Sequence, residues 1–384
     1  MKKRNESVIY ICAILITILI LTMLSVYASA SYKESESTRL NKGISAKAAA
    51  IYEPEGKVFI YEKCADQRLP MASTTKIMTA IVVEDLLDLD EIVTIGPESV
   101  GVEGSSAYLR EGDEYTVLEL LYAMMLQSAN DAATALAYYT AGGIDEFAEL
   151  MNGKAEALGL TNTHFTNPHG LDDEDHYTTA RDLAVTGAKL LESETLKEIV
   201  STYKKSFTYG ERTRTYVNHN KLLRLYDGAI GIKTGFTKRC GRCLVGAAER
   251  DGIKFVSVTL DAPSDWSDHE AMLDFAFDSY EKTMLCKKGD YNQALRVIGG
   301  NKDSLTVSAK ESLEIIKEKE VKIIDRYTSL PGYVVAPIKE GDVVGKVVFR
   351  LENKTYTVDL IADESIDSTL NDSIFTRLLK KILR

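Results

Sequence analysis

The sequence predicts a mixed α/β (α+β) fold, and three features of its 384 residues support this prediction. Apolar residues recur at helical spacing in segments 116–159 and 179–191. Segment 203–260 alternates Thr, Tyr, Val and Phe, which favours strands. After Lys287, short apolar runs alternate with charged and glycine-containing turns, the pattern of a small β-sandwich. The composition, 45% hydrophobic and 27% charged with 7 Pro, fits two or three folded domains.

The first 30 residues have the organisation of an export signal. Residues 2–4 are basic, residues 8–27 are nearly all apolar, and Ala28-Ser29-Ala30 has the small-x-small form that signal peptidase cleaves. The apolar run is also long enough to span a bilayer, so an uncleaved anchor is the alternative. In both cases the sequence predicts that the rest of the chain lies outside the cytoplasm, with residues 31–41 as a tether.

A hairpin and a helix are the first elements expected after the tether. Apolar runs at residues 48–52 and 58–61 flank Glu53-Pro54-Glu55-Gly56, which predicts two strands joined by a turn. Pro70 and Ser73 then mark the start of a helix, because an apolar, periodic run follows them.

This helix carries a candidate nucleophile and a candidate base. Residues three apart lie on one helix face with Cβ atoms about 5 to 6 Å apart, so we expect the Ser73 hydroxyl within hydrogen-bonding reach of the Lys76 amine. In a first turn, free backbone N–H groups and the positive end of the helix dipole favour a developing oxyanion. A lone Ser-x-x-Lys also occurs at ordinary helix starts, so the hypothesis needs partners elsewhere in the chain.

Two later segments supply such partners. Ser128-Ala129-Asn130 lies between two predicted helices, where it either caps the second helix or projects polar groups into a cleft. In Lys233-Thr234-Gly235 the lysine supplies a positive charge, the threonine and nearby Thr237 supply hydroxyls, and the glycine lets backbone approach a ligand closely. Strands at 244–248 and 255–260 and a helix at 271–280 are predicted to complete this region.

The charge balance and the cysteines exclude several classes of function. The net charge is −11, or −13 without residues 1–30, and no basic stripe that would bind nucleic acid is present. Cys240 and Cys243 have the spacing of half a zinc site, but no second pair follows within reach. Structural thiols are favoured over a redox pair and over metal ligands. The acidic segment 172–176 matches no common ligand spacing and is expected to be a solvated loop.

Taken together, Ser73-x-x-Lys76, Ser128-x-Asn130 and Lys233-Thr234-Gly235 resemble the three signatures of the penicillin-interacting serine enzymes. The surrounding Ser-Thr-Thr-Lys-Ile-Met-Thr, Asn-Pro-His-Gly-Leu-Asp and Asp-Gly-Ala-Ile-Gly-Ile-Lys-Thr-Gly-Phe-Thr are similar to the D-alanyl-D-alanine carboxypeptidases among the low-molecular-mass penicillin-binding proteins. The resemblance is strong over residues 42–286. It implies a serine β-lactamase/DD-peptidase-like fold, a five-stranded antiparallel sheet flanked by helices with a helical subdomain opposite and the site between them.

The resemblance also implies roles for the residues. Ser73 would be the nucleophile of an acyl transfer, and Lys76 its base if uncharged; burial and the charge of Lys233 would both lower the pKa of that amine. Ser128 would pass a proton to the departing D-alanine. Asn130 would hold the substrate amide and the amine of Lys76.

The remaining residues would bind the two negative charges of the reacting substrate, the oxyanion and the terminal carboxylate. Backbone N–H groups of Ser73 and Phe236 would form the oxyanion hole. Lys233, Thr234 and Thr237 would receive the terminal carboxylate, beside Gly235. No metal or organic cofactor is implied.

The sequence departs from the family pattern in two places. Ala129 stands where relatives often have Gly, and a small side chain should fit there. The segment Asp265-Trp266-Ser267-Asp268-His269 lacks the Arg that relatives often place after the penultimate strand to help bind the carboxylate. In addition, no Glu-x-x-Leu-Asn motif offers a rival carboxylate base.

The last part of the chain carries no catalytic constellation. Residues 287–370 resemble the C-terminal β-rich domain of the same carboxypeptidases, which is thought to hold the catalytic domain off the membrane. In residues 371–384 an apolar stripe lies beside four basic residues, which predicts an amphipathic helix on the membrane surface. A helix that packs on the protein is the alternative.

These inferences predict an exported enzyme on the extracytoplasmic face of the bacterial cell membrane. It would be a serine-type D-Ala-D-Ala carboxypeptidase that trims the terminal D-alanine from peptidoglycan stem pentapeptides, and β-lactams would acylate the same serine. Three alternatives stay open: a serine β-lactamase of the same fold, a DD-endopeptidase that shares all these residues, and a catalytically idle cell-wall binding protein.

Overall fold

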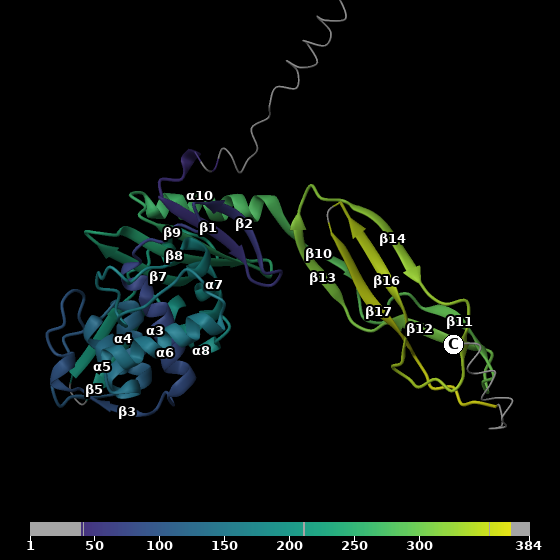
Figure 1. Ribbon diagram of the computed structural model, residues 1–384, viewed down its shortest axis with the longest axis horizontal. Helices are drawn as coiled ribbons and strands as arrows, with labels where there is room; N and C mark the ends of the chain where they lie inside the picture. Colours follow the sequence, from purple (N-terminus) through teal and green to yellow (C-terminus); the bar gives the residue numbers. More distant parts are fainter. Residues whose placement is uncertain (1–39, 41, 210–211, 353, 370–384) are drawn as a thin grey trace, which may run out of the picture. The chain divides into compact units, whose positions relative to one another are not determined.

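The computed structural model describes residues 40, 42–209, 212–352 and 354–369 (Figure 1). The export signal predicted over residues 1–30 and the amphipathic helix predicted over residues 371–384 lie outside these ranges, as does most of the tether. In the described ranges, no helix combines the length and the apolar character that crossing a membrane requires.

A five-stranded antiparallel sheet with the strand order β2-β1-β9-β8-β7 forms the centre of the first folded region. Its strands come from both ends of that region: β1 (Ala48–Glu53), β2 (Val58–Lys63), β7 (Ala229–Thr237), β8 (Gly241–Arg250) and β9 (Ile253–Leu260). The early hairpin joins the later strands through β1 and β9, where Ala50 pairs with Val258. The sheet implied by the resemblance is therefore confirmed, and β7 is one of its two edge strands.

Helices cover both faces of this sheet (Figure 1). On one face α7 (Ala180–Leu190) packs so closely that a Cβ on its Gly187 would lie 2.9 Å from a methyl carbon of Val245. On the other face α10 (Asp265–Ser279) sends the fully buried His269 to Ser257 Oγ at 2.8 Å and Thr259 Oγ1 at 3.0 Å. Helix α10 begins six residues before the predicted start, and Asp265 and Asp268 in its first turn favour that earlier start.

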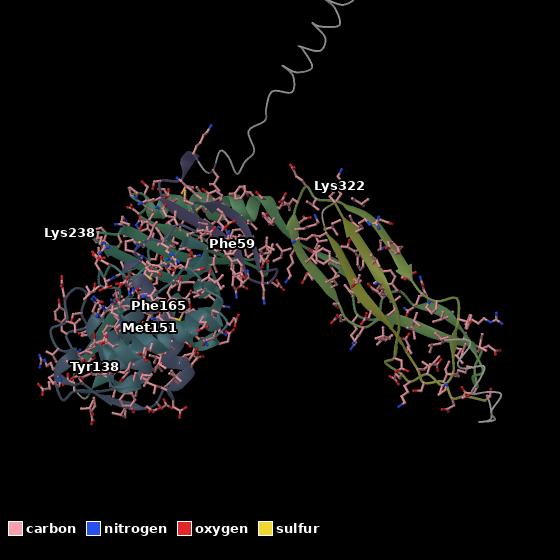
Figure 2. The ribbon with its side chains drawn as sticks, in the orientation of Figure 1. Phe59, Tyr138, Met151, Phe165, Lys238 and Lys322 are labelled. Atoms are coloured by element: carbon pink, nitrogen blue, oxygen red, sulfur yellow. The ribbon has the colours of Figure 1, made fainter. Side chains whose placement is uncertain are left out.

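The helical subdomain packs around α3. Its main helices are α3 (Lys76–Leu86), α4 (Val117–Leu126), α5 (Asn130–Ala141), α6 (Ile144–Ala157) and α8 (Glu194–Ser201). A capping box between Thr116 and Glu119 starts α4, and Gly142, with φ 83°, ends α5. The side chains of Met151 and Phe165, labelled in Figure 2, are buried in the hydrophobic core shared by these helices and the sheet.

Short elements connect these layers. They are η1 (Ala72–Thr75), β3 (Ile92–Thr94), η2 (Pro97–Ser99), β4 (Glu114–Thr116), β5 (Lys204–Tyr209), β6 (Arg212–Val217) and α9 (Leu222–Leu225). The pairs β3–β4 and β5–β6 are antiparallel. The sequence patterns did not predict β3, β4 or α8, because three-residue strands and an eight-residue helix give little periodicity.

The C-terminal part is a β domain, as predicted. It contains β10 (Tyr280–Cys286), β11 (Gln293–Ile298), β12 (Ser304–Ala309), β13 (Leu313–Glu318), β14 (Ile323–Ser329), β15 (Val334–Val335), β16 (Val343–Leu351) and β17 (Thr355–Ala362). Strand β10 pairs with β13, and the others form a sheet with the order β14-β16-β17-β12-β11-β15. Two buried clusters, one around Phe349 and Leu360 and one around Val307 and Ile366, hold the domain together.

Candidate active site

The predicted nucleophile, Ser73, lies on the 3₁₀ turn η1, which runs directly into α3. The sequence placed Ser73 in the first turn of the helix itself; the α-helical part begins three residues later, at Lys76. The hydroxyls of Thr74 and Thr75 donate to backbone carbonyls of the same segment at 2.6 and 2.8 Å. The turn that presents Ser73 is therefore fixed by its own side chains.

The amine of Lys76 is completely buried and contacts three oxygen atoms. Its Nζ lies 3.0 Å from Ser73 Oγ, 2.7 Å from Asn130 Oδ1 and 2.6 Å from the His169 carbonyl. A neutral amine has two N–H donors and one lone pair; the two shorter contacts use the donors and leave the lone pair for the Ser73 hydroxyl. Burial, and after it the charge of Lys233, lowers the pKa of Lys76 well below its ordinary value, although Asp131 opposes the shift.

The start of α5 orients Asn130 for this contact. Asn130 Nδ2 donates to the Glu103 carbonyl at 2.6 Å, which leaves Oδ1 to accept from Lys76. Next to it, the buried carboxylate of Asp131 accepts from the backbone N–H groups of Ala107 and Leu109 at 3.0 and 3.1 Å. The loop between η2 and β4 and the start of α5 are thereby held against each other.

Ser128 and Lys233, which come from two different motifs, form a second contact at the site. Ser128 is buried, has a left-handed backbone with φ 60°, and accepts from Lys233 Nζ at 3.0 Å. Lys233 also donates to the Thr234 carbonyl at 3.0 Å, and burial lowers the pKa of Lys233 to about 7. Each of the two serines therefore has its own buried lysine.

Strand β7 passes very close to the nucleophile because residue 235 is a glycine. A Cβ at Gly235 would lie 3.0 Å from the Met71 carbonyl oxygen and 3.1 Å from the Ser73 nitrogen. Because β7 is an edge strand, one row of its backbone groups is not taken up by a neighbouring strand of the sheet. The next residue, Phe236, is 65% exposed beside this edge.

A cavity of about 380 Å³ opens at this junction. Five of the predicted residues line it: Ser73, Ser128, Thr234, Gly235 and Phe236. Lys76, Asn130 and Lys233 lie behind the lining and reach the two serines through the contacts given above. The three motifs, far apart in sequence, are thus brought together at one site.

Thr237 does not join this lining. Its Oγ1 lies 2.9 Å from Asp172 Oδ1 and 3.2 Å from Cys240 Sγ, and it accepts from the Cys240 backbone N–H at 3.1 Å. The thiols of Cys240 and Cys243 are buried and not joined in a disulfide. Thr237 holds the turn between β7 and β8.

Other residues at the site were missed by the sequence analysis. Ser105, His219, Lys221, Arg242, Asp265 and Trp266 also line the cavity. His176, at the end of the exposed acidic segment, is buried; it accepts from the Thr166 N–H at 3.0 Å, and its Nε2 lies 2.7 Å from Thr75 Oγ1. No local pattern distinguishes these residues, because their positions depend on strand register and loop packing.

Comparison with known proteins decides which family has this arrangement. The family model for D-alanyl-D-alanine carboxypeptidase matches residues 33–264, more than half of the chain. The chain belongs to the D-alanyl-D-alanine carboxypeptidase family. A second model, the C-terminal domain of penicillin-binding protein 5, matches residues 280–368.

Relatives of the carboxypeptidase family resemble the chain over most of its length. This chain is 30% identical to D-alanyl-D-alanine carboxypeptidase DacF of Bacillus subtilis over 361 residues. The match covers 91% of this chain and 93% of that protein. The chain is 33% identical to DacC of Escherichia coli over 338 residues, 84% of each protein.

Solved structures show the same similarity. The structure of penicillin-binding protein 5 from Haemophilus influenzae superimposes on this chain with a TM-score of 0.67 and 29% sequence identity. The match covers 85% of this chain and 98% of that one. A PBP3 from Streptococcus pneumoniae has a TM-score of 0.69 and 26% identity, covering 84% and 100%. The predicted family, fold and enzyme class, a serine peptidase, are confirmed.

Proposed function

We propose that Ser73 of this carboxypeptidase attacks the penultimate D-alanine carbonyl of peptidoglycan stem pentapeptides and releases the terminal D-alanine. The proposal depends above all on the contact between the buried amine of Lys76 and Ser73 Oγ at 3.0 Å. In the attack, the Ser73 proton passes to Lys76 and a covalent bond forms between Oγ and the carbonyl carbon. The backbone N–H groups of Ser73 and Phe236 stabilise the oxyanion.

Ser128 completes the acylation step. It donates its proton to the leaving amine of D-alanine and takes a replacement from Lys233, whose Nζ lies 3.0 Å from Ser128 Oγ. At the end of this step the peptide is esterified to Ser73, Lys76 is protonated and Lys233 is neutral. Asn130 keeps Lys76 oriented throughout, through its Oδ1 contact at 2.7 Å.

Hydrolysis of the acyl-enzyme reverses these transfers with water in place of the amine. The attacking water gives its proton through Ser128 to Lys233, and Ser73 Oγ leaves with the proton held by Lys76. Both lysines return to their starting states. A β-lactam would open on Ser73 by the same first step, and its ester would persist if water were slow to reach the carbonyl.

We also propose the placement and division of the chain predicted above. Residues 1–30 would direct export or anchor the chain, residues 42–286 would form the catalytic domain, and residues 287–370 would form the C-terminal domain. Residues 371–384 would bind the membrane surface. Because residues 1–30 would export the chain, the enzyme would act on the extracytoplasmic face. The matches at residues 33–264 and 280–368 support this division.

Mass spectrometry of a stem pentapeptide incubated with purified protein tests the proposed activity. We expect the peptide to lose one alanine, and the variant Ser73→Ala to leave it intact. A penicillin adduct that turns over rapidly would indicate a β-lactamase, and cleavage of cross-linked dimers without D-alanine release would indicate an endopeptidase. Failure of the wild type to cleave any of these substrates and to bind a fluorescent penicillin would leave only a binding role.

A further inference from the structure

A cationic side chain that belongs to none of the three motifs lines the cavity. Arg242, near the start of β8, lines it together with Ser73 and Thr234. In the antiparallel register Arg242 lies directly opposite Phe236, and residues directly opposite share one face of a sheet. Because alternate residues of a strand also share a face, the side chains of Thr234, Phe236 and Arg242 lie on the same side of β7 and β8.

A buried carboxylate holds this arginine in place. Arg242 Nε donates to Asp265 Oδ1 at 2.9 Å, and the Asp265 side chain is only 4% exposed whereas that of Arg242 is 42% exposed. Asp265 Oδ1 also accepts from the Trp266 backbone N–H at 3.1 Å, so the start of α10 fixes the carboxylate. Asp265 is the sole acidic partner of Arg242 within the described residues. One end of the guanidinium is thus anchored while the group remains open to the cavity.

The charge around the cavity favours an anion. Lys221 and Arg242 both line it, and their cationic groups lie 5.9 and 5.8 Å from the ring centre of Trp266. Asp265 is the one acidic residue in the lining, and it is already paired with Arg242. A ligand that enters next to Ser73 therefore meets positive charge without a matching free carboxylate.

Lys233, the cation that the family motif supplies, is engaged elsewhere. Its buried Nζ donates to Ser128 Oγ and to the Thr234 carbonyl, both at 3.0 Å. A planar guanidinium fork matches the two oxygens of a carboxylate better than an ammonium group does. Arg242 therefore combines the required charge, geometry and exposure.

We infer that Arg242, oriented by Asp265, receives the free α-carboxylate of the substrate's terminal residue and thereby restricts cleavage to peptides with an unblocked C-terminus. Arg242 is the specificity-determining residue, Asp265 is its positioning residue, and Thr234 adds a hydroxyl from the neighbouring strand. The inference rests on the proposed function and deepens it. It also explains how the chain can bind the carboxylate although segment 265–269 has no arginine. The guanidinium comes instead from β8, the strand next to β7.

The test compares two peptides that end in D-Ala-D-Ala and differ only in a free carboxylate or a carboxamide at the C-terminus. For each, kcat/KM is measured with wild type, Arg242→Gln, Arg242→Lys, Asp265→Asn and the control Arg239→Gln, an exposed arginine on the preceding turn that does not line the cavity. We expect Arg242→Gln to reduce the preference for the free acid at least about tenfold, mainly through KM, because a hydrogen bond to a charged group is lost. Arg239→Gln should keep the wild-type preference.

The other variants separate binding from folding. Arg242→Lys retains the charge but not the planar guanidinium fork, so its preference for the free acid should lie between those of wild type and Arg242→Gln. If Arg242→Gln does not fold, Arg242→Lys takes its place in the comparison. Asp265→Asn should weaken the preference in the same direction, again through KM. An Arg242→Gln or Arg242→Lys enzyme that matches wild type on both peptides, or loses both activities equally, would overturn the role of Arg242 alone. A wild type that cleaves neither peptide and binds no fluorescent penicillin would instead contradict the proposed function.

Discussion

Lys76 Nζ lies 3.0 Å from Ser73 Oγ, with its other contacts to Asn130 Oδ1 and the His169 carbonyl. This relationship fixes which atom can take the serine proton. The amine sits in a fully buried position where the charged form is disfavoured, so a neutral amine is available to accept the proton without a histidine or a carboxylate at the nucleophile.

The first prediction concerns the pH dependence of acylation. Lys76 must be neutral, so the rate should rise as pH increases through the lowered pKa of Lys76. Lys233 must be charged to resupply Ser128, and its pKa is about 7, so the rate should fall as pH rises above that value. The acylation rate with a chromogenic β-lactam, measured between about pH 5 and about pH 9, should therefore fall above about pH 7.

The matched variant for this profile is Lys233→Arg. Because a guanidinium stays protonated over the whole range, it cannot resupply Ser128; the acylation rate should be lower at every pH, and the falling limb near pH 7 should disappear. A falling limb that is unchanged in this variant would assign it to another group.

A second prediction concerns the glycine beside the nucleophile. Gly235→Ala would place a Cβ 3.0 Å from the Met71 carbonyl and 3.1 Å from the Ser73 nitrogen, so β7 must move away from the turn. We expect acylation by penicillin to fall by roughly 10-fold to 100-fold, because a misplacement of reacting groups by about 1 Å costs about 100-fold and the displacement needed here is smaller. The control is Gly153→Ala in α6, where a Cβ meets nothing within 4 Å and acylation should be unchanged.

The role of His176 leads to a third prediction, on stability. Burial lowers the pKa of His176 from 6.5 to about 4. Because the unfolded state binds the proton more readily, stability should be lost as pH falls from 6.5 toward 4, by up to about 3 kcal/mol from this residue. The midpoint of thermal unfolding, measured across this range, should depend less on pH in His176→Asn.

A control separates titration of the ring from loss of its hydrogen bond. Thr75→Val removes the contact between Thr75 Oγ1 and His176 Nε2, but it leaves the buried ring in place. This variant should be less stable at every pH and should keep the wild-type slope. Equal slopes in wild type and His176→Asn would show that other groups control acid unfolding.

The motifs and the main layers could be predicted from the sequence, because they depend on local spacing and periodicity. Contacts that depend on tertiary pairing could not. Ser73 and Lys76 are three residues apart on one segment, so local geometry predicts their contact. Arg242 reaches the cavity because it lies opposite Phe236, and this pairing depends on strand register. Thr237 was expected to bind the carboxylate, but the β7–β8 turn directs its hydroxyl to Asp172 and Cys240. Tertiary pairing of this kind has no signal in a single sequence.

The membrane association proposed for the C-terminus gives a fourth prediction. Deleting residues 371–384 removes the apolar stripe and its basic residues, so the processed protein should move from the membrane fraction to the soluble fraction. Activity on a soluble pentapeptide should persist, since the deleted segment contains none of the proposed catalytic residues. An unchanged distribution between fractions would rule out the segment as the membrane-binding element.

The location of the penicillin adduct is the decisive test of whether Lys76 activates Ser73. Purified wild type and Lys76→Arg are incubated with a penicillin at neutral pH, digested and analysed by tandem mass spectrometry. We expect an adduct on Ser73 in the wild type and almost none in Lys76→Arg, because arginine stays protonated and cannot accept the serine proton. An adduct on a different residue, or acylation of Ser73 in Lys76→Arg at the wild-type rate, would contradict this expectation.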